Sequence, residues 1–237
     1  MVTTGIQQID QRKPALIAGI SLIIMTLASF FSYGYVHACL VVQGDASATF
    51  QNIQSSHPLF QAEIFGWVVI LICDIVVAWA FYIVMKPAHE KLSLLAAWFR
   101  LIYSAILGIA ISNLLFMSIL TRTAPSLVSE QLSSQGMLFL SAFESIWSIG
   151  LITFGIHLAV VGYVALRFTR SPKIISILLM IAGVGYILLH TCNVFLPQYE
   201  GMITLLKYIF TVPMIVGELG FGLWLLFKGG KTSSSSA

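Results

Sequence analysis

Residues 64–85, IFGWVVILICDIVVAWAFYIVM, decide the fold, and they hold a single charged side chain, Asp74. At 1.5 Å per residue, a helix needs about 20 mostly apolar residues to cross a hydrocarbon core about 30 Å thick. This stretch meets both requirements and therefore predicts a transmembrane helix. Asp74 is then the first residue to explain, because an acid within a membrane needs a partner.

Five further stretches on either side have the same apolar character. The six predicted spans lie near 15–42, 60–85, 92–120, 137–166, 173–195 and 202–227. The 237-residue chain is 58% hydrophobic and 9% charged, whereas soluble proteins carry about 25% charged residues. We therefore expect an all-α integral membrane protein, with a single six-helix transmembrane domain over residues 1–230 and a disordered tail at 231–237.

Lys and Arg are distributed unevenly between the predicted spans, and positively charged loops stay on the cytoplasmic side. If the N-terminus lies inside, the outer loops hold only Arg122. The inner segments then hold nine basic residues: Arg12, Lys13, Lys86, Lys91, Arg167, Arg170, Lys173, Lys228 and Lys231. The pattern predicts a multi-pass protein of the bacterial cytoplasmic membrane with both termini in the cytoplasm.

The stretches between the predicted spans carry residues typical of turns. These are Gln43-Gly44-Asp45, Lys86-Pro87, Ser171-Pro172 and Pro197. Two longer polar segments, 44–59 and 121–136, are expected to fold partly over the bundle.

Composition argues against several classes of function. The net charge of +3 is small and scattered, which excludes a nucleic-acid surface. Cys39, Cys73 and Cys192 form no CxxC pair, which argues against redox and structural zinc motifs. A disulfide between Cys39 and Cys192 stays open beside free thiols. No phosphate-binding loop or GxSxG motif supports catalysis, and no cofactor is indicated.

Counting residues from the span ends places four ionisable side chains about 12–16 Å above the cytoplasmic edge. This inner tier is Asp74, Arg100, His157 and Glu218. Arg100 stays charged and needs an anion, which Asp74 or Glu218 can supply. With His157 neutral, the tier sums to −1, so one carboxylate is left for a proton, a cation or another ligand. The same residues could instead only fix helix packing.

A second, outer polar tier falls about 5–10 Å below the outer edge by the same count. It comprises Glu63, Asn113, Glu144, His190 and Lys207, with His37 near them. Glu63, Glu144 and His190 could hold a divalent metal if they converge. Lys207 is expected to neutralise one of the glutamates instead.

Two other patterns concern helix faces. Glu63 and Asp74 are eleven residues apart, as are Lys207 and Glu218, and that spacing returns to nearly the same face of a helix. Tyr186, His190 and Asn193 form a third polar stripe. Four aromatic residues are predicted to anchor helices at the interface or to pack between them: Trp67, Trp98, Trp147 and Tyr208.

Short strings through nearly the whole chain carry a family resemblance. They are KPALIAG (13–19), GDASAT (44–49), CDIV (73–76), FRL (99–101), FGIHL (154–158), IAGVGY (181–186) and GEL (217–219). On these strings the chain resembles the bacterial six-helix membrane proteins grouped as domain of unknown function 4386. The resemblance implies a six-span fold and leaves the activity open.

Three hypotheses follow for function. The first is a ligand- or ion-binding membrane protein, transporter- or sensor-like, whose site is formed by the inner tier of Asp74, Arg100, His157 and Glu218. The second is a non-catalytic accessory or scaffold protein whose buried charges only fix helix packing. The third is a metal-dependent membrane enzyme that uses the outer tier. The expected partners are the lipid bilayer and a small molecule or ion, and the oligomeric state is not indicated.

Overall fold

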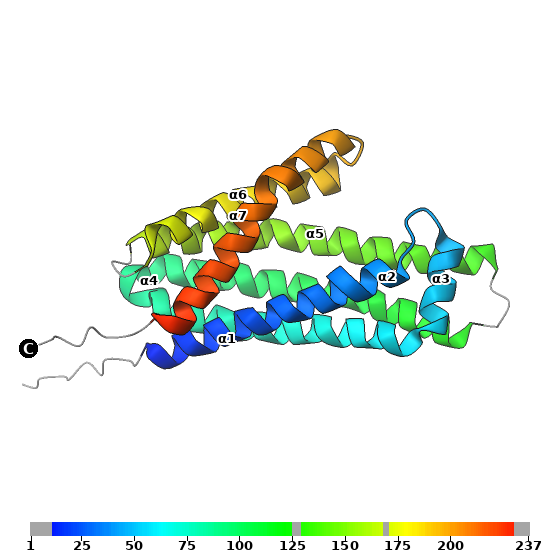
Figure 1. The fold of residues 1–237 in the computed structure, drawn as a ribbon, viewed down its shortest axis with the longest axis horizontal. Coiled ribbons are helices and arrows are strands. Elements are labelled where there is room, and N and C mark those ends of the chain that lie inside the picture. The colour runs from blue at the N-terminus through cyan, green and yellow to red at the C-terminus, as the bar shows by residue number, and fades with distance from the viewer. Residues whose placement is uncertain (1–10, 125–128, 168–170, 230–237) are drawn as a thin grey trace, which may run out of the picture.

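The computed structural model describes residues 11–124, 129–167 and 171–229, and every regular element in that part of the chain is a helix. The predicted tail at 231–237, and with it Lys231 and Arg170, lies outside the described residues. The elements are α1 (Arg12–Ser29), η1 (Phe30–His37), α2 (Ala38–Leu40), α3 (Ala46–Ser55), α4 (His57–Thr123), α5 (Glu130–Arg167), α6 (Lys173–Phe195) and α7 (Glu200–Phe227). Residues 12–40 form one continuous rod (Figure 1).

Five helices are long and apolar enough to cross a membrane: residues 12–40, α4, α5, α6 and α7. The all-helical, apolar character predicted from the sequence is therefore confirmed. The two predicted spans near 60–85 and 92–120 both lie within α4, which is one 67-residue helix by its hydrogen bonding.

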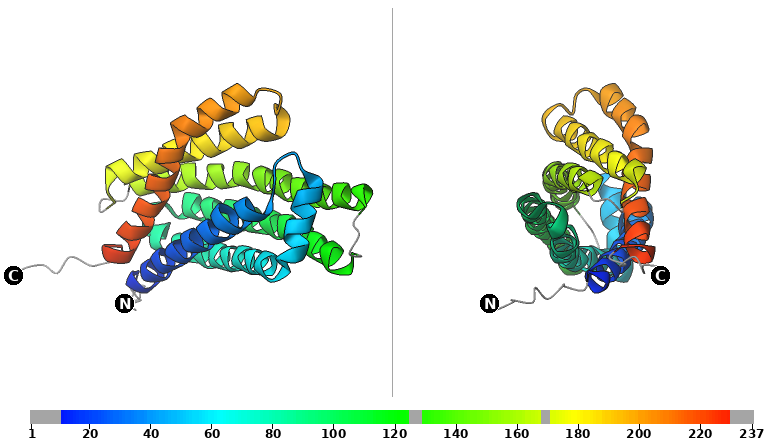
Figure 2. Two further views of the ribbon diagram at one scale, coloured as in Figure 1. Left: turned by 45° about the vertical axis from the view of Figure 1, so that its right-hand side comes forward. Right: turned by 90° about the vertical axis from the view of Figure 1, so that its left-hand side faces the viewer.

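Helix α4 reverses direction near its middle, so that its two arms run side by side (Figures 1 and 2). Pro87 lacks the N–H that continues a helix, and His89 has the non-helical angles φ −164° and ψ 94°. The Nδ1 atom of His89 accepts a hydrogen bond from the Leu92 N–H at 3.3 Å and so caps the second arm. The Lys86-Pro87 turn predicted from the sequence corresponds to this reversal.

The long helices pack in a closed ring, which the end-on view in Figure 2 shows. Helix α5 lies between α4 and α6, α7 lies between α6 and α1, and α1 packs back onto α4. Glycines permit the close crossings. A Cβ on Gly155 of α5 would lie 2.7 Å from the Gly183 carbonyl of α6, and one on Gly19 of α1 would lie 3.0 Å from the Gly222 carbonyl of α7.

The first and last helices meet at one end of the bundle (Figure 1). The guanidinium of Arg12 donates to the carbonyls of Leu225, Leu226 and Gly229 at 3.2, 2.7 and 2.9 Å. The first two carbonyls belong to the last turn of α7, where helical partners run out, and Gly229 follows just after that helix. Arg12 therefore caps α7 and holds the two ends of the described chain together.

The polar segment 44–59 contains the amphipathic helix α3, which buries Phe50 and Ile53 and packs against α4 and α5. Gly44 takes the left-handed angle φ +78°, and Asp45 caps α3 by accepting from the Ala48 N–H at 2.8 Å. The other polar segment, 121–136, which we also expected to fold partly over the bundle, lies within the long helices at residues 121–123 and 130–136. Helix α4 continues to Thr123 and α5 begins at Glu130, and polar residues of these ends are packed, with Thr121 and Ser133 only 1% and 2% exposed. Residues 125–128 lie outside the described residues.

Candidate functional site

An ion pair between the two arms of α4 lies inside the bundle. Nη2 of Arg100 is 2.6 Å from Oδ1 of Asp74, and the two side chains are 1% and 0% exposed. The reversal at His89 creates this contact, because it brings the first arm alongside the second. Asp74 is thus the anion that Arg100 requires.

His157 of α5 completes the cluster and is held in one tautomer. Its Nδ1 lies 2.8 Å from the Ala96 carbonyl oxygen, and its Nε2 lies 3.1 Å from Nη1 of Arg100. A carbonyl oxygen only accepts and a guanidinium only donates. Nδ1 therefore carries the proton and Nε2 accepts from Arg100, which assigns a neutral imidazole and leaves the three-residue cluster without net charge.

Arg100 also contacts groups with no charge. Its guanidinium lies over the rings of Phe81 and Phe154, 5.6 and 5.3 Å from their centroids, and Nη2 donates to Met25 Sδ at 3.8 Å. Within the described chain, Nε of Arg100 and Oδ2 of Asp74 have no hydrogen-bond partner. The cluster therefore connects α1, α4 and α5 through one side chain.

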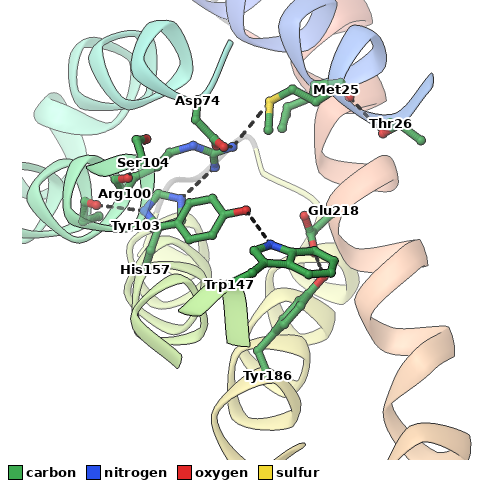
Figure 3. Close-up of polar contacts among 12 residues, drawn as sticks. Met25, Thr26, Asp74, Arg100, Tyr103, Ser104, Trp147, His157, Tyr186 and Glu218 are labelled. Carbon is green, nitrogen blue, oxygen red and sulfur yellow. Dashed lines mark hydrogen bonds and ion pairs between the residues drawn. The ribbon is translucent and has the colours of Figure 1, made fainter. Parts of the chain in front are cut away.

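Glu218 of α7, the fourth residue of the predicted inner tier, stands apart from the other three. The Tyr186 hydroxyl of α6 donates to its Oε1 at 2.9 Å. No described Lys, Arg or His forms an ion pair with Glu218. In Figure 3, the hydrogen-bonded pair Tyr103 and Trp147 lies between Glu218 and the Arg100 cluster.

A cavity of about 300 Å³ lies beside Glu218 and is lined by α1, η1, α4, α5, α6 and α7. Among the described residues, Glu218 alone contributes a charged side chain to the lining, and Asp74, Arg100 and His157 do not reach it. Six aromatic residues form much of the wall: Phe30, Trp67, Tyr103, Trp147, Phe154 and Tyr186. The predicted inner tier is therefore divided into a neutral cluster behind the wall and one acid facing the cavity.

In the outer tier, His37 lies between two carboxylates. Its Nδ1 is 2.9 Å from Oε1 of Glu63, and its Nε2 is 3.5 Å from Oε1 of Glu144. The π-helix η1 ends at His37. One turn earlier, the Ser32 hydroxyl donates to the Glu63 carbonyl at 3.1 Å, in space left by the missing side chain of Gly66.

The other residues of the outer tier do not join His37. His190 contacts the Ser148 hydroxyl at 3.3 Å, and Asn113 donates to carbonyls of its own helix. Lys207 is exposed and pairs with no acid in the described chain. His37, and not Lys207, therefore contacts the two glutamates, because the far ends of α6 and α7 diverge from α1 and α4 (Figure 1).

The described residues contain no group of three His, Cys, Asp or Glu side chains suited to a metal ion. The set Glu63, Glu144 and His190 is not assembled, because His190 lies with Ser148. The sulfurs of Cys39, Cys73 and Cys192 are free thiols.

Two of the tryptophans expected to anchor helices or to pack between them pack in the core and also line the cavity. Trp67 is 1% exposed and Trp147 is half-buried, and both belong to the cavity wall. Residues three or four apart share a helix face, so the spacing from Glu63 to Trp67 and from Glu144 to Trp147 is a signal that could have indicated their inward direction. Trp98 is 57% exposed, in keeping with an outward position.

Comparison with known proteins places the chain in a family. The family model for a domain of unknown function, DUF4386, matches residues 17–229. An uncharacterized protein of Archaeoglobus fulgidus is 29% identical over 173 residues, which cover 72% of this chain and 86% of that protein. No solved structure matches the chain. The match over nearly all of the sequence shows that the chain belongs to the DUF4386 family.

Proposed function

We propose that this chain is a six-span protein of the cell membrane, with both termini in the cytoplasm, that binds a small ligand in the cavity beside Glu218. A transporter or a sensor would use such a site. The observation that carries the proposal is the position of Glu218: a carboxylate with no basic partner in the described chain, in the wall of an otherwise uncharged cavity of about 300 Å³.

The six-span topology rests on the shape of α4. Each arm of α4, before and after His89, exceeds the about 20 residues that a span requires, and residues 12–40, α5, α6 and α7 supply four more spans. The contact of Arg12 with the end of α7 fits an even number of crossings. Lys86 and Lys91 flank the reversal, which the positive-inside rule assigns to the cytoplasmic side.

The two parts of the inner tier have different roles in this proposal. The neutral cluster of Asp74, Arg100 and His157 fixes the arms of α4 against α5. Glu218 carries the remaining charge of the tier, and an acid costs free energy within a membrane. The hydrogen bond from Tyr186 offsets part of that cost, and a ligand that contacts Glu218 would offset more of it.

Native mass spectrometry combined with a cavity-filling variant tests the proposal. Ser29 lines the cavity, so Ser29→Trp should block it, while Ser112→Trp places the same side chain outside the lining. We expect a bound molecule on the wild-type protein and on Ser112→Trp, and none on Ser29→Trp. The proposal is wrong if the wild-type protein carries no added mass, or if Ser29→Trp keeps it.

The scaffold hypothesis is the alternative, and the burial of the Arg100 cluster behind the cavity wall favours it. It treats the cavity as a packing defect. Ser29→Trp would then raise thermal stability by filling space, and the wild-type protein would purify without a ligand. The same two variants therefore separate the two hypotheses.

A further inference from the structure

The charge in the cavity wall determines which ligands it can accept. Glu218 is the only charged residue that the described part of the chain contributes to the lining. The positive charge of Arg100 is already matched by Asp74 at 2.6 Å and lies outside the cavity. An anionic ligand would thus meet a carboxylate and no free cation, whereas a cationic ligand would meet an acid that has only the Tyr186 hydroxyl as a partner.

The aromatic wall favours an organic cation over a metal ion. Aromatic ring faces attract ammonium groups, and aromatic cages are a known means of binding quaternary ammonium. Trp67, Tyr103, Trp147 and Tyr186 all line the cavity. Calcium takes six to eight oxygen ligands and magnesium six, but the described residues place a single carboxylate, that of Glu218, in this lining.

The opening of the cavity favours a ligand with an apolar body. Phe30 of η1 and Ile215 of α7 belong to the lining and are 62% and 46% exposed. The cavity therefore reaches the surface between the first and last helices, next to apolar side chains. In the six-span topology proposed above, that surface faces the acyl chains of the bilayer.

We propose that the ligand is an amphiphilic organic cation, an amine or quaternary ammonium group on an apolar body, which enters between α1 and α7 and places its charge at Glu218. This inference rests on the proposed ligand-binding function. It adds the chemical class of the ligand and the route of entry.

Three probes of similar shape and different charge test the ligand class: benzyltrimethylammonium, its neutral carbon isostere neopentylbenzene, and the anion benzylsulfonate. Trp67 and Trp147 lie in the cavity wall, so tryptophan fluorescence of the full-length protein in nanodiscs reports binding, with empty nanodiscs as the blank. We expect the cation to bind about tenfold more tightly than the other two probes. Glu218→Gln should abolish this preference, and Glu144→Gln, outside the cavity, should keep it.

The possible results separate the two proposals. Equal or tighter binding of the neutral or anionic probe overturns the cationic class but leaves a ligand-binding cavity. An unchanged cation affinity in Glu218→Gln also overturns it. If none of the three probes binds, the cationic class is wrong, and the mass spectrum of the wild-type protein decides the proposed function separately. The comparison of the three probes on the wild-type protein can refute the inference by itself, so the test does not depend on the folding of a variant.

Discussion

Replacing Asp74 by Asn should strongly destabilise the protein, because it leaves the Arg100 guanidinium buried without an anion. Asp74 is 0% exposed and lies 2.6 Å from Arg100. At that distance and an effective dielectric constant of 20, the attraction is about 6 kcal/mol. Removing one partner of a buried pair costs about 3–5 kcal/mol in measured cases.

The other contacts of Arg100 reduce that loss. His157 still accepts from Nη1, and the rings of Phe81 and Phe154 still lie over the guanidinium. We therefore expect Asp74→Asn to lower the free energy of unfolding by about 3 kcal/mol.

A double-mutant cycle in mixed micelles measures the pair directly. Unfolding by added dodecyl sulfate, followed by circular dichroism, gives the free energies of the wild-type protein, Asp74→Asn, Arg100→Met and the double variant. The double variant removes both charges, so it should be more stable than the sum of the single losses predicts. The expected coupling energy is at least about 2 kcal/mol.

A small coupling energy would refute this reasoning. If it lies within about 0.5 kcal/mol of zero, the ion pair does not hold the arms of α4 together. The reasoning would equally be contradicted if Asp74→Asn lowered the free energy of unfolding no more than an exposed control, Glu90→Gln, does.

Three further predictions concern topology and packing. Two single-cysteine proteins test the orientation, one that keeps only Cys39 and one that carries only Glu90→Cys. Cys39 should react with an impermeant maleimide in intact cells, and the cysteine at position 90 should react only after permeabilisation. The reverse pattern would contradict the proposed orientation. Gly155→Leu should prevent the close crossing of α5 on α6, where a Cβ would already lie 2.7 Å from a backbone oxygen, and thermal unfolding in detergent should show a lower midpoint. His37→Phe should leave the buried carboxylate of Glu63 without its 2.9 Å partner. The free energy of unfolding in the same dodecyl sulfate titration should fall by about 3–5 kcal/mol, and an unchanged value would show that Glu63 does not need His37.

Much of the architecture could be predicted because bilayer thickness fixes the length of a spanning helix. The apolar runs gave the helices around Asp74, His157 and Glu218 without any knowledge of contacts. Sequence was less informative about ends and connections. The ends of α4 and α5 extend into the polar segment 121–136, because small polar side chains such as Thr121 and Ser133 can be buried there while their hydroxyls donate to backbone carbonyls four residues earlier.

Depth along a helix is a property of the sequence, and the depth count selected Asp74, Arg100, His157 and Glu218 as residues of one level. Which of them touch depends on helix rotation and on the order of helices around the ring, and a one-dimensional count contains neither. Only the tertiary structure joined Asp74 to Arg100 through the reversal of α4, placed Glu218 beside Tyr186, and turned Trp67 and Trp147 toward the cavity. In the same way, the π-helix η1 set His37 against Glu63, a contact that no spacing rule for a regular helix would have given.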